Sequence, residues 1–354
     1  MPPRERSLII LAVFVVCLLY LSRLDHPGFL TPGEGRYAEA AHAMVRTGDW
    51  VIPRVNGQIH LEKPPLLYWL VAGSFSLNGA SEASARIVSA LASLLTGFMV
   101  FILGRRIYGP IAGWLSVFIL LSGGTWSIYG RFVTTDIPTI AFQALGIWAY
   151  WMAFKTGKRS YLLSMGIALA ACTLIRGFLG VVIPVFTIFG FVLTRRKWGP
   201  RDPLGWFYAI LLILVLVVPW HVMLEMKMPG FLRHYLVENH LYRFVGDYPP
   251  RGASYLSLSQ FWLASFVGYM PWSLFVPAAI LSTWRRIQEN GSRHEGEWLG
   301  LIWAGSVFLI VSISEARLER YFLPACPGLA LWMGGRLSRF AEGKIAFRPG
   351  WVLY

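Results

Sequence analysis

Two adjacent charged residues, Glu62 and Lys63, stand just before Pro64-Pro65 and an apolar run, where they could take part in phosphate chemistry. Neighbouring side chains point in different directions, so one of the two could face inward while the other faces lipid phosphates. The pair could equally be an interfacial charge pair that anchors a surface helix. Both interpretations stay open from the sequence alone.

Asp136 and Arg176 are ionisable residues at the ends of apolar stretches. Asp136 could be a helix N-cap, or a carboxylate at the mouth of a membrane cavity, where charge is expensive and tends to be functional. Arg176 could be a snorkelling anchor or a phosphate ligand.

Two later segments, HYLVENHLYRFVGDYPPRG and SISEARLERYFLPACPG, add His240, Arg243, Arg317 and Tyr321. The first segment would spread its charged residues over more than one helix face, so it does not predict a metal site by itself. His240 could pair with a carboxylate from another loop, or be solvated. If the two segments converge with Lys63, the resulting chamber suits an anionic lipid headgroup and a hydroxyl that is to be activated.

The elements that must position these residues are membrane helices, because 56% of the 354 residues are hydrophobic and only 14% are charged. The net charge of +14 lies in short basic clusters between apolar stretches, a pattern that indicates topology signals and not a nucleic-acid binder. The three cysteines fall within apolar segments and indicate packing residues. About ten spans are predicted, at 8–22, 84–104, 110–129, 133–153, 160–175, 177–194, 204–222, 258–282, 298–314 and 321–338.

The basic clusters fall in alternate loops and at both termini, which predicts that both termini are cytoplasmic. The opposite side then receives two long loops, 23–83 and 223–257. We expect residues 1–340 to form one transmembrane domain and residues 341–354 a cytoplasmic tail.

The first long loop has the signals of a helix from Pro32 to about Thr47. Thr31 would be the N-cap, Glu34 would complete a capping box, and Gly48 would end the helix. An apolar stripe at helical spacing would lie on the membrane surface or on top of the bundle; it consists of Tyr37, Ala40, Ala41, Met44 and Val45.

The ordered motifs GEGRYAEAAHAMVRTGDW, LEKPPLLYWL, TTDIP, RGF, PWH, ENHLYRF and RLERYFLP span nearly the whole chain. In this order they resemble the bacterial aminoarabinose transferases that modify lipid A, within the wider group of protein O-mannosyltransferases and GT-C glycosyltransferases. The resemblance implies an all-α polytopic membrane enzyme in the bacterial inner membrane. It would transfer a sugar, with inversion, from a polyprenyl-phosphate donor to a lipid or surface-glycan acceptor on the periplasmic side.

The same resemblance implies roles for individual residues. Glu62 with the His240 region would hold a divalent ion, Zn or Mg/Mn. Glu34 and Asp136 are the candidate catalytic carboxylates. The residues implied in binding the donor phosphate or lining its pocket are Lys63, Arg243, Arg317, Arg36, Arg176 and Tyr321.

The chain departs from the family pattern at Gly33, where relatives carry the Asp proposed as the base. Glu34 or Asp136 could replace it, the acceptor could need no base, or activity could be reduced. The family's soluble C-terminal domain is expected to be absent.

Two other classes of function stay open. A transporter or flippase of a lipid-linked anion is disfavoured because the charges gather at one rim and not near the midplane. A catalytically impaired partner subunit would follow from Gly33.

Overall fold

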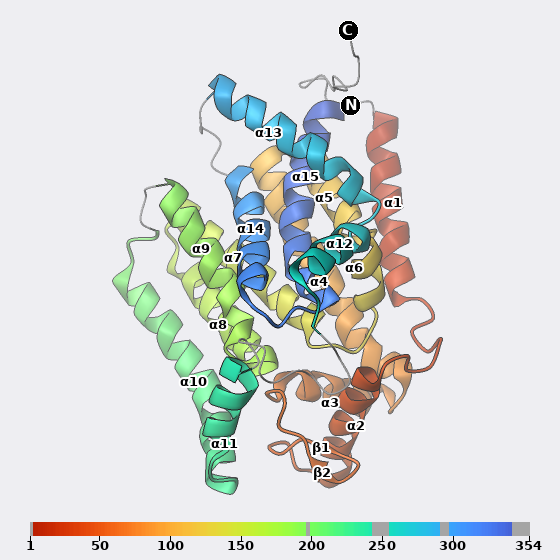
Figure 1. Cartoon of the computed structure of the whole chain (residues 1–354), viewed down its shortest axis with the longest axis vertical. Helices are drawn as coiled ribbons and strands as arrows, with labels where there is room; N and C mark the ends of the chain where they lie inside the picture. Colours follow the sequence, from red (N-terminus) through yellow and green to blue (C-terminus); the bar gives the residue numbers. More distant parts are fainter. Residues whose placement is uncertain (1–2, 196–198, 243–254, 291–296, 342–354) are drawn as a thin grey trace.

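The structure, a computed structural model, describes residues 3–195, 199–242, 255–290 and 297–341, which fold as a helical bundle (Figure 1). The first elements are α1 (Pro3–Leu21), α2 (Pro32–Thr47), β1 (Arg54–Val55), β2 (Gln58–Ile59), α3 (Leu66–Asn78), α4 (Glu82–Tyr108), α5 (Pro110–Leu121), α6 (Gly124–Tyr129) and α7 (Asp136–Thr156). They are followed by α8 (Arg159–Arg176), α9 (Leu179–Arg195), α10 (Pro203–Lys227), α11 (Phe231–Arg233) and the π-helix η1 (His234–Tyr242). The last are α12 (Leu258–Gly268), the 3₁₀ helix η2 (Trp272–Phe275), α13 (Val276–Asn290), α14 (Glu297–Ile313), the 3₁₀ helix η3 (Glu319–Ala325) and α15 (Cys326–Ala341).

Each of the predicted spans contains a helix, although several are shorter than a membrane crossing requires. Within the described ranges, α4, α7 and α10 are each long and apolar enough to cross a membrane alone. A fourth crossing would join α12 to the helix that follows it, through a bend of 102°. The membrane character of the chain is clear from these helices, whereas the number of about ten spans stays a prediction.

Two predicted spans, 110–129 and 258–282, are broken, and their breaks contact each other. The backbone N–H of Gly124, at the start of α6, donates to the carbonyl of Met270 at 2.9 Å. A Cβ at Gly124 would lie 3.2 Å from the Gly268 carbonyl oxygen, a tight contact, so the close approach favours a glycine. Pro271, which has no backbone N–H, follows directly. A contact between two distant segments therefore joins the two breaks.

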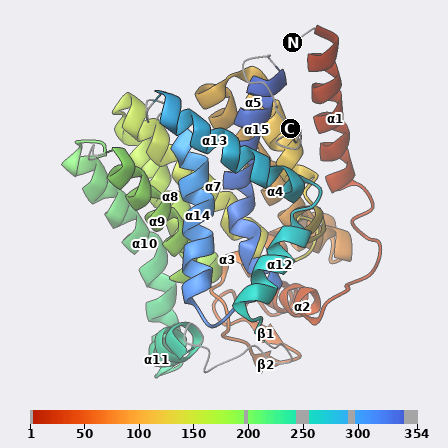
Figure 2. The same ribbon diagram turned by 45° about the horizontal axis from the view of Figure 1, so that its top comes forward.

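The bundle has two distinct ends. The start of α1, the helix α13 and the last turns of α15 lie at one end, whereas α2, α3, the β1–β2 hairpin and α11 lie at the other (Figures 1 and 2). The main hydrophobic core joins helices from both halves of the chain and includes the buried Trp126, Trp303 and Trp332. Cys172 and Cys326 are also buried in apolar surroundings, while Cys17 is partly buried.

Helix α2 begins and ends where the sequence predicts. The Thr31 Oγ1 accepts from the backbone N–H of Glu34 at 3.3 Å. At the other end Gly48 has φ +73°, and its N–H donates to the Met44 carbonyl at 2.9 Å. In the predicted stripe Ala40 and Met44 are buried against Tyr68 of α3.

The stripe is shorter than predicted at one end, because Val45 is 38% exposed. Ala41 is fully buried with α3 residues in a neighbouring cluster. Helix α2 therefore lies on the bundle through α3, and this packing fixes the loop that carries Glu62 and Lys63.

Candidate active site

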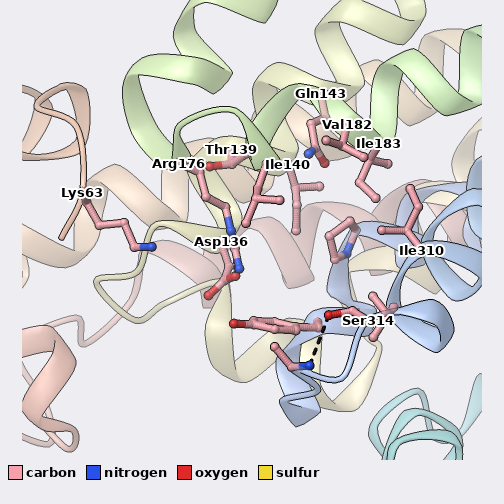
Figure 3. A pocket seen from close by; sticks show the side chains of 15 residues that line it. Lys63, Asp136, Thr139, Ile140, Gln143, Arg176, Val182, Ile183, Ile310 and Ser314 are labelled. Carbon is pink, nitrogen blue, oxygen red and sulfur yellow. Dashed lines mark hydrogen bonds and ion pairs between the residues drawn. The ribbon is translucent and has the colours of Figure 1, made fainter. Parts of the chain in front are cut away.

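A cavity near the α2–α3 end of the bundle joins three charged residues and a tyrosine from four separate segments (Figure 3). Lys63 comes from the loop before α3, Asp136 is the first residue of α7, Arg176 is the last residue of α8, and Tyr321 lies in η3. The remaining lining is mostly apolar and comes from α7, α9, the end of α14 and η3; it includes Ile140, Leu179, Val182, Ile183, Ile310, Val311 and Pro324. The cavity thus has a charged part and an apolar part.

Asp136 is the centre of the charged part. Its side chain is 4% exposed, and its Oδ1 accepts from the Arg176 guanidinium. Its Oδ2 lies 3.3 Å from Nε of Arg320. The interpretation of Asp136 as an N-cap is wrong: Thr135 occupies the N-cap position, and Asp136 lies within the first turn of α7. The positive end of the helix dipole and the two guanidinium groups hold its carboxylate there.

Arg176 and Tyr321 form one wall beside Asp136. The guanidinium carbon of Arg176 lies 5.5 Å from the centre of the Tyr321 ring, a cation–π contact. The Arg176 side chain is 19% exposed and lines the cavity, so it does not act as a snorkelling anchor. Its two contacts fix a guanidinium at the boundary between the charged and apolar parts.

The adjacent residues Glu62 and Lys63 point in different directions, as predicted. Lys63 lines the cavity, and its amine extends toward Asp136 (Figure 3). Glu62 instead lies 3.9 Å from the guanidinium of Arg36, in a half-exposed pair. Arg36 is thereby engaged in an ion pair, and it is not among the residues that line the cavity.

Glu34 lies away from the cavity in a buried ion pair with Arg86 of α4. The Arg86 Nε donates to Oε1 at 2.9 Å and its Nη2 to Oε2 at 3.2 Å. The backbone N–H groups of Leu30 and Val133 also donate to the carboxylate, at 3.0 and 3.2 Å. The capping box is therefore only half formed, because Glu34 accepts from Leu30 and not from Thr31. A role for Glu34 as base stays a prediction, and this geometry is that of a structural ion pair.

Arg320 is a charged neighbour of Asp136 from the segment SISEARLERYFLPACPG, and the resemblance gave it no role. It lies beside Asp136 and is not itself among the residues that line the cavity. The predicted phosphate ligand from that segment, Arg317, donates to the Ser312 carbonyl at 3.1 Å and does not line the cavity. Burial lowers the pKa of Arg320, but the combined attraction of Asp136 and of the neighbouring Tyr321, Tyr129 and Tyr37 outweighs burial, so the pKa of this group is raised. The signal in the sequence is the position of Arg320 directly before Tyr321.

Tyr37 of α2 brings a neutral hydroxyl to the same region. Burial raises the pKa of Tyr37, and the negative charge of Asp136 raises it further, while Arg320 has the opposite effect. The group therefore stays protonated and can donate a hydrogen bond. The sequence pattern had indicated only a packing role for this residue.

Two of the predicted residues cannot be placed. Arg243 lies outside the described residues, and so does the side chain of His240. Within the part of the chain that is described, no three His, Cys, Asp or Glu side chains come together as metal ligands. Glu62 is paired with Arg36, so these residues alone do not fit a metal site. The predicted divalent ion depends on His240 and stays a prediction.

Comparison with known proteins finds the same family that the motifs indicate. Residues 62–223 match the model of the dolichyl-phosphate-mannose-protein mannosyltransferase family. The chain is 28% identical over 334 residues to an undecaprenyl phosphate-alpha-4-amino-4-deoxy-L-arabinose arabinosyl transferase of Edwardsiella ictaluri, covering 93% of this chain and 59% of that protein. It is also 28% identical to a transferase of the same name from Pseudomonas fluorescens, again over 59% of that protein's length.

Solved structures agree with this result. ArnT from Cupriavidus metallidurans, bound to undecaprenyl phosphate, matches with a TM-score of 0.81 and 26% identity, over 97% of this chain and 62% of that one. The archaeal oligosaccharyltransferase AglB of Archaeoglobus fulgidus shares the fold, with a TM-score of 0.61 and 14% identity, over 98% of this chain and 53% of that one. The chain thus spans about three fifths of the length of the aminoarabinose transferases that it matches. The chain is similar to these aminoarabinose transferases in sequence and has the GT-C glycosyltransferase fold, as its motifs predict.

Proposed function

We propose that this protein transfers a sugar from a polyprenyl-phosphate donor, with inversion, to a lipid or surface-glycan acceptor. One observation supports this above all: a single cavity joins Lys63, Asp136 and Arg176 to an apolar lining. A polyprenyl phosphate needs both parts, because its phosphate is anionic and its tail is hydrocarbon. The names of the relatives suggest undecaprenyl phosphate as the carrier and 4-amino-4-deoxy-L-arabinose as the sugar. The motif resemblance suggests lipid A as the acceptor.

The charged part of the cavity suits the departure of the donor phosphate. In the transfer, an acceptor oxygen forms a bond to the anomeric carbon while the bond from that carbon to the phosphate oxygen breaks. The electron pair leaves with the phosphate, whose negative charge rises in the transition state. Lys63 and Arg176 lie where they would stabilise that charge, the role of fixed cations in a partly desolvated site.

Asp136 is the candidate that the geometry favours as the base. It lies in the cavity, whereas the carboxylate of Glu34 is bound by four N–H donors in a site away from it. An acceptor hydroxyl would pass its proton to a carboxylate oxygen of Asp136 as it attacks. An acceptor that is itself a phosphate would need no such transfer.

The charged part of this cavity would face the periplasm. The basic clusters of the sequence lie in alternate loops, which supports cytoplasmic termini in an inner membrane. The start of α1 and the end of α15 lie at the end of the bundle opposite to α2 and α3 (Figure 1). A divalent ion held by Glu62 and the His240 region would add positive charge beside the leaving phosphate.

The test is incubation of the purified full-length chain with a membrane lipid extract, followed by mass spectrometry of the lipids that gain or lose a sugar. We expect the native protein to form a glycosylated lipid, and Lys63→Ala and Asp136→Asn to lose that product. Lys158→Ala is the control, because this exposed lysine lies between α7 and α8, outside the cavity.

Two results would contradict the proposal. One is a native protein that moves lipid across a vesicle membrane without transferring sugar, which would favour a transporter. The other is full transfer by both cavity variants, which would place the chemistry elsewhere.

A further inference from the structure

Three consecutive residues of η3 contact three different helices around the cavity. Glu319 accepts a hydrogen bond from the Tyr129 hydroxyl of α6 at 3.0 Å. Arg320 reaches Asp136 of α7, and Tyr321 packs on Arg176 of α8. The flanking contacts fix the backbone of η3, which places Arg320 beside Asp136.

The contact between Arg320 and Asp136 is weaker than the one between Arg176 and Asp136. The Arg320 side chain is 40% exposed, against 19% for Arg176. Its N–O distance of 3.3 Å is longer than the roughly 2.7–2.9 Å of a strong charge-assisted hydrogen bond. Arg320 is therefore the partner that Asp136 can lose most easily.

Three cations act on the Asp136 carboxylate. Arg176, Arg320 and Lys63 all attract its single carboxylate. An anion that enters between these cations competes directly with Asp136 for their N–H groups. The half-exposed guanidinium of Arg320 can move to such an anion with little loss of packing.

We propose that Arg320 is an exchangeable ligand of the donor phosphate: it pairs with Asp136 in this structure and donates to a phosphate oxygen when the donor binds. This inference rests on the proposed function of the cavity. The exchange leaves Asp136 with one arginine partner. Its carboxylate then becomes a stronger base toward the hydroxyl of the sugar acceptor once the donor is in place. Donor binding and activation of the base are thereby coupled through one side chain.

The test measures binding of undecaprenyl phosphate to the purified full-length chain in detergent, with undecaprenol as the probe that has the same tail but no phosphate. Arg320→Gln should weaken binding of undecaprenyl phosphate roughly tenfold and leave undecaprenol binding unchanged, as expected for the loss of one charged hydrogen bond. The matched control is Arg233→Gln, because Arg233 is an exposed arginine of α11 that does not line the cavity.

Asp136→Asn supplies the readout that a purely structural role for Arg320 would not change. Removing the competing carboxylate should tighten binding of undecaprenyl phosphate several-fold, and Arg320→Gln should reverse that gain in the double variant. Equal phosphate-dependent binding by the native chain and Arg320→Gln would overturn the inference alone. A native chain that binds both probes equally would instead contradict the proposed function.

Discussion

The buried pair of Glu34 and Arg86 allows a structural role to be separated from a catalytic one. The two side chains are 0% and 3% exposed, so neither charge can be solvated by water if its partner is removed. Arg86→Met would leave the Glu34 carboxylate with only the N–H groups of Leu30 and Val133. Breaking such a pair from one side costs about 3–5 kcal/mol, which is the loss of unfolding free energy that we expect.

Glu34→Gln should lower the free energy of unfolding by less than Arg86→Met does. Arg86 would keep its hydrogen bonds to the carbonyls of Leu24, Pro27 and Gly28, and its guanidinium also lies over two phenyl rings. We therefore expect about 1.5–3 kcal/mol, the usual value of a hydrogen bond to a charged group. In the double variant both charges are gone. Its loss of unfolding free energy should therefore be smaller than the sum of the losses in the two single variants, by about 1–3 kcal/mol.

The measurement is equilibrium unfolding of the purified variants in mixed micelles with rising denaturing detergent, together with the sugar-transfer assay. Arg233→Met is the control for loss of an exposed guanidinium. Sugar transfer per folded molecule should stay close to native in Glu34→Gln. Native stability combined with lost transfer in that variant would refute the structural role and identify Glu34 as the base.

Two further predictions concern the cavity and the family's base position. A Cβ at Gly33 would meet only the Thr31 hydroxyl oxygen, at 3.7 Å, so Gly33→Asp should fold normally. If the missing carboxylate limits the reaction, the sugar-transfer rate should rise at least about tenfold, within the usual contribution of a general base; an unchanged rate would show that it does not. Tyr321→Phe keeps the ring over Arg176 and should bind undecaprenyl phosphate within about twofold of native, whereas Tyr321→Leu should lose about 0.5–2 kcal/mol of binding. Equal losses in the two Tyr321 variants would assign the effect to the hydroxyl.

Helix α2 could be predicted to the residue because its end signals are local. Thr31 and Gly48 act on backbone groups within four positions of themselves, and those groups are near in every conformation of the chain. The breaks at Gly124 and Pro271 have local signals too, because Gly123-Gly124 and Pro271 disfavour a continuous helix. The contact between the two breaks could not be predicted, since it joins segments that are more than a hundred residues apart.

In the candidate site, too, the sequence indicates which residues are charged at a cost but not which residues they contact. An ionisable residue at the end of an apolar span is expensive, so its presence indicates a need for charge, and Lys63, Asp136 and Arg176 could be found in this way. The sequence does not show which residue pairs with each charged group and offsets its desolvation. Glu34 pairs with Arg86 of α4, 52 residues away. Its carboxylate also accepts from the Val133 N–H and so holds the start of α2 against the loop before α7. Asp136 pairs with Arg176 and Arg320 at the edge of a cavity. The same carboxylate chemistry is therefore structural in one place and available to a substrate in the other, because only the second site has space beside it.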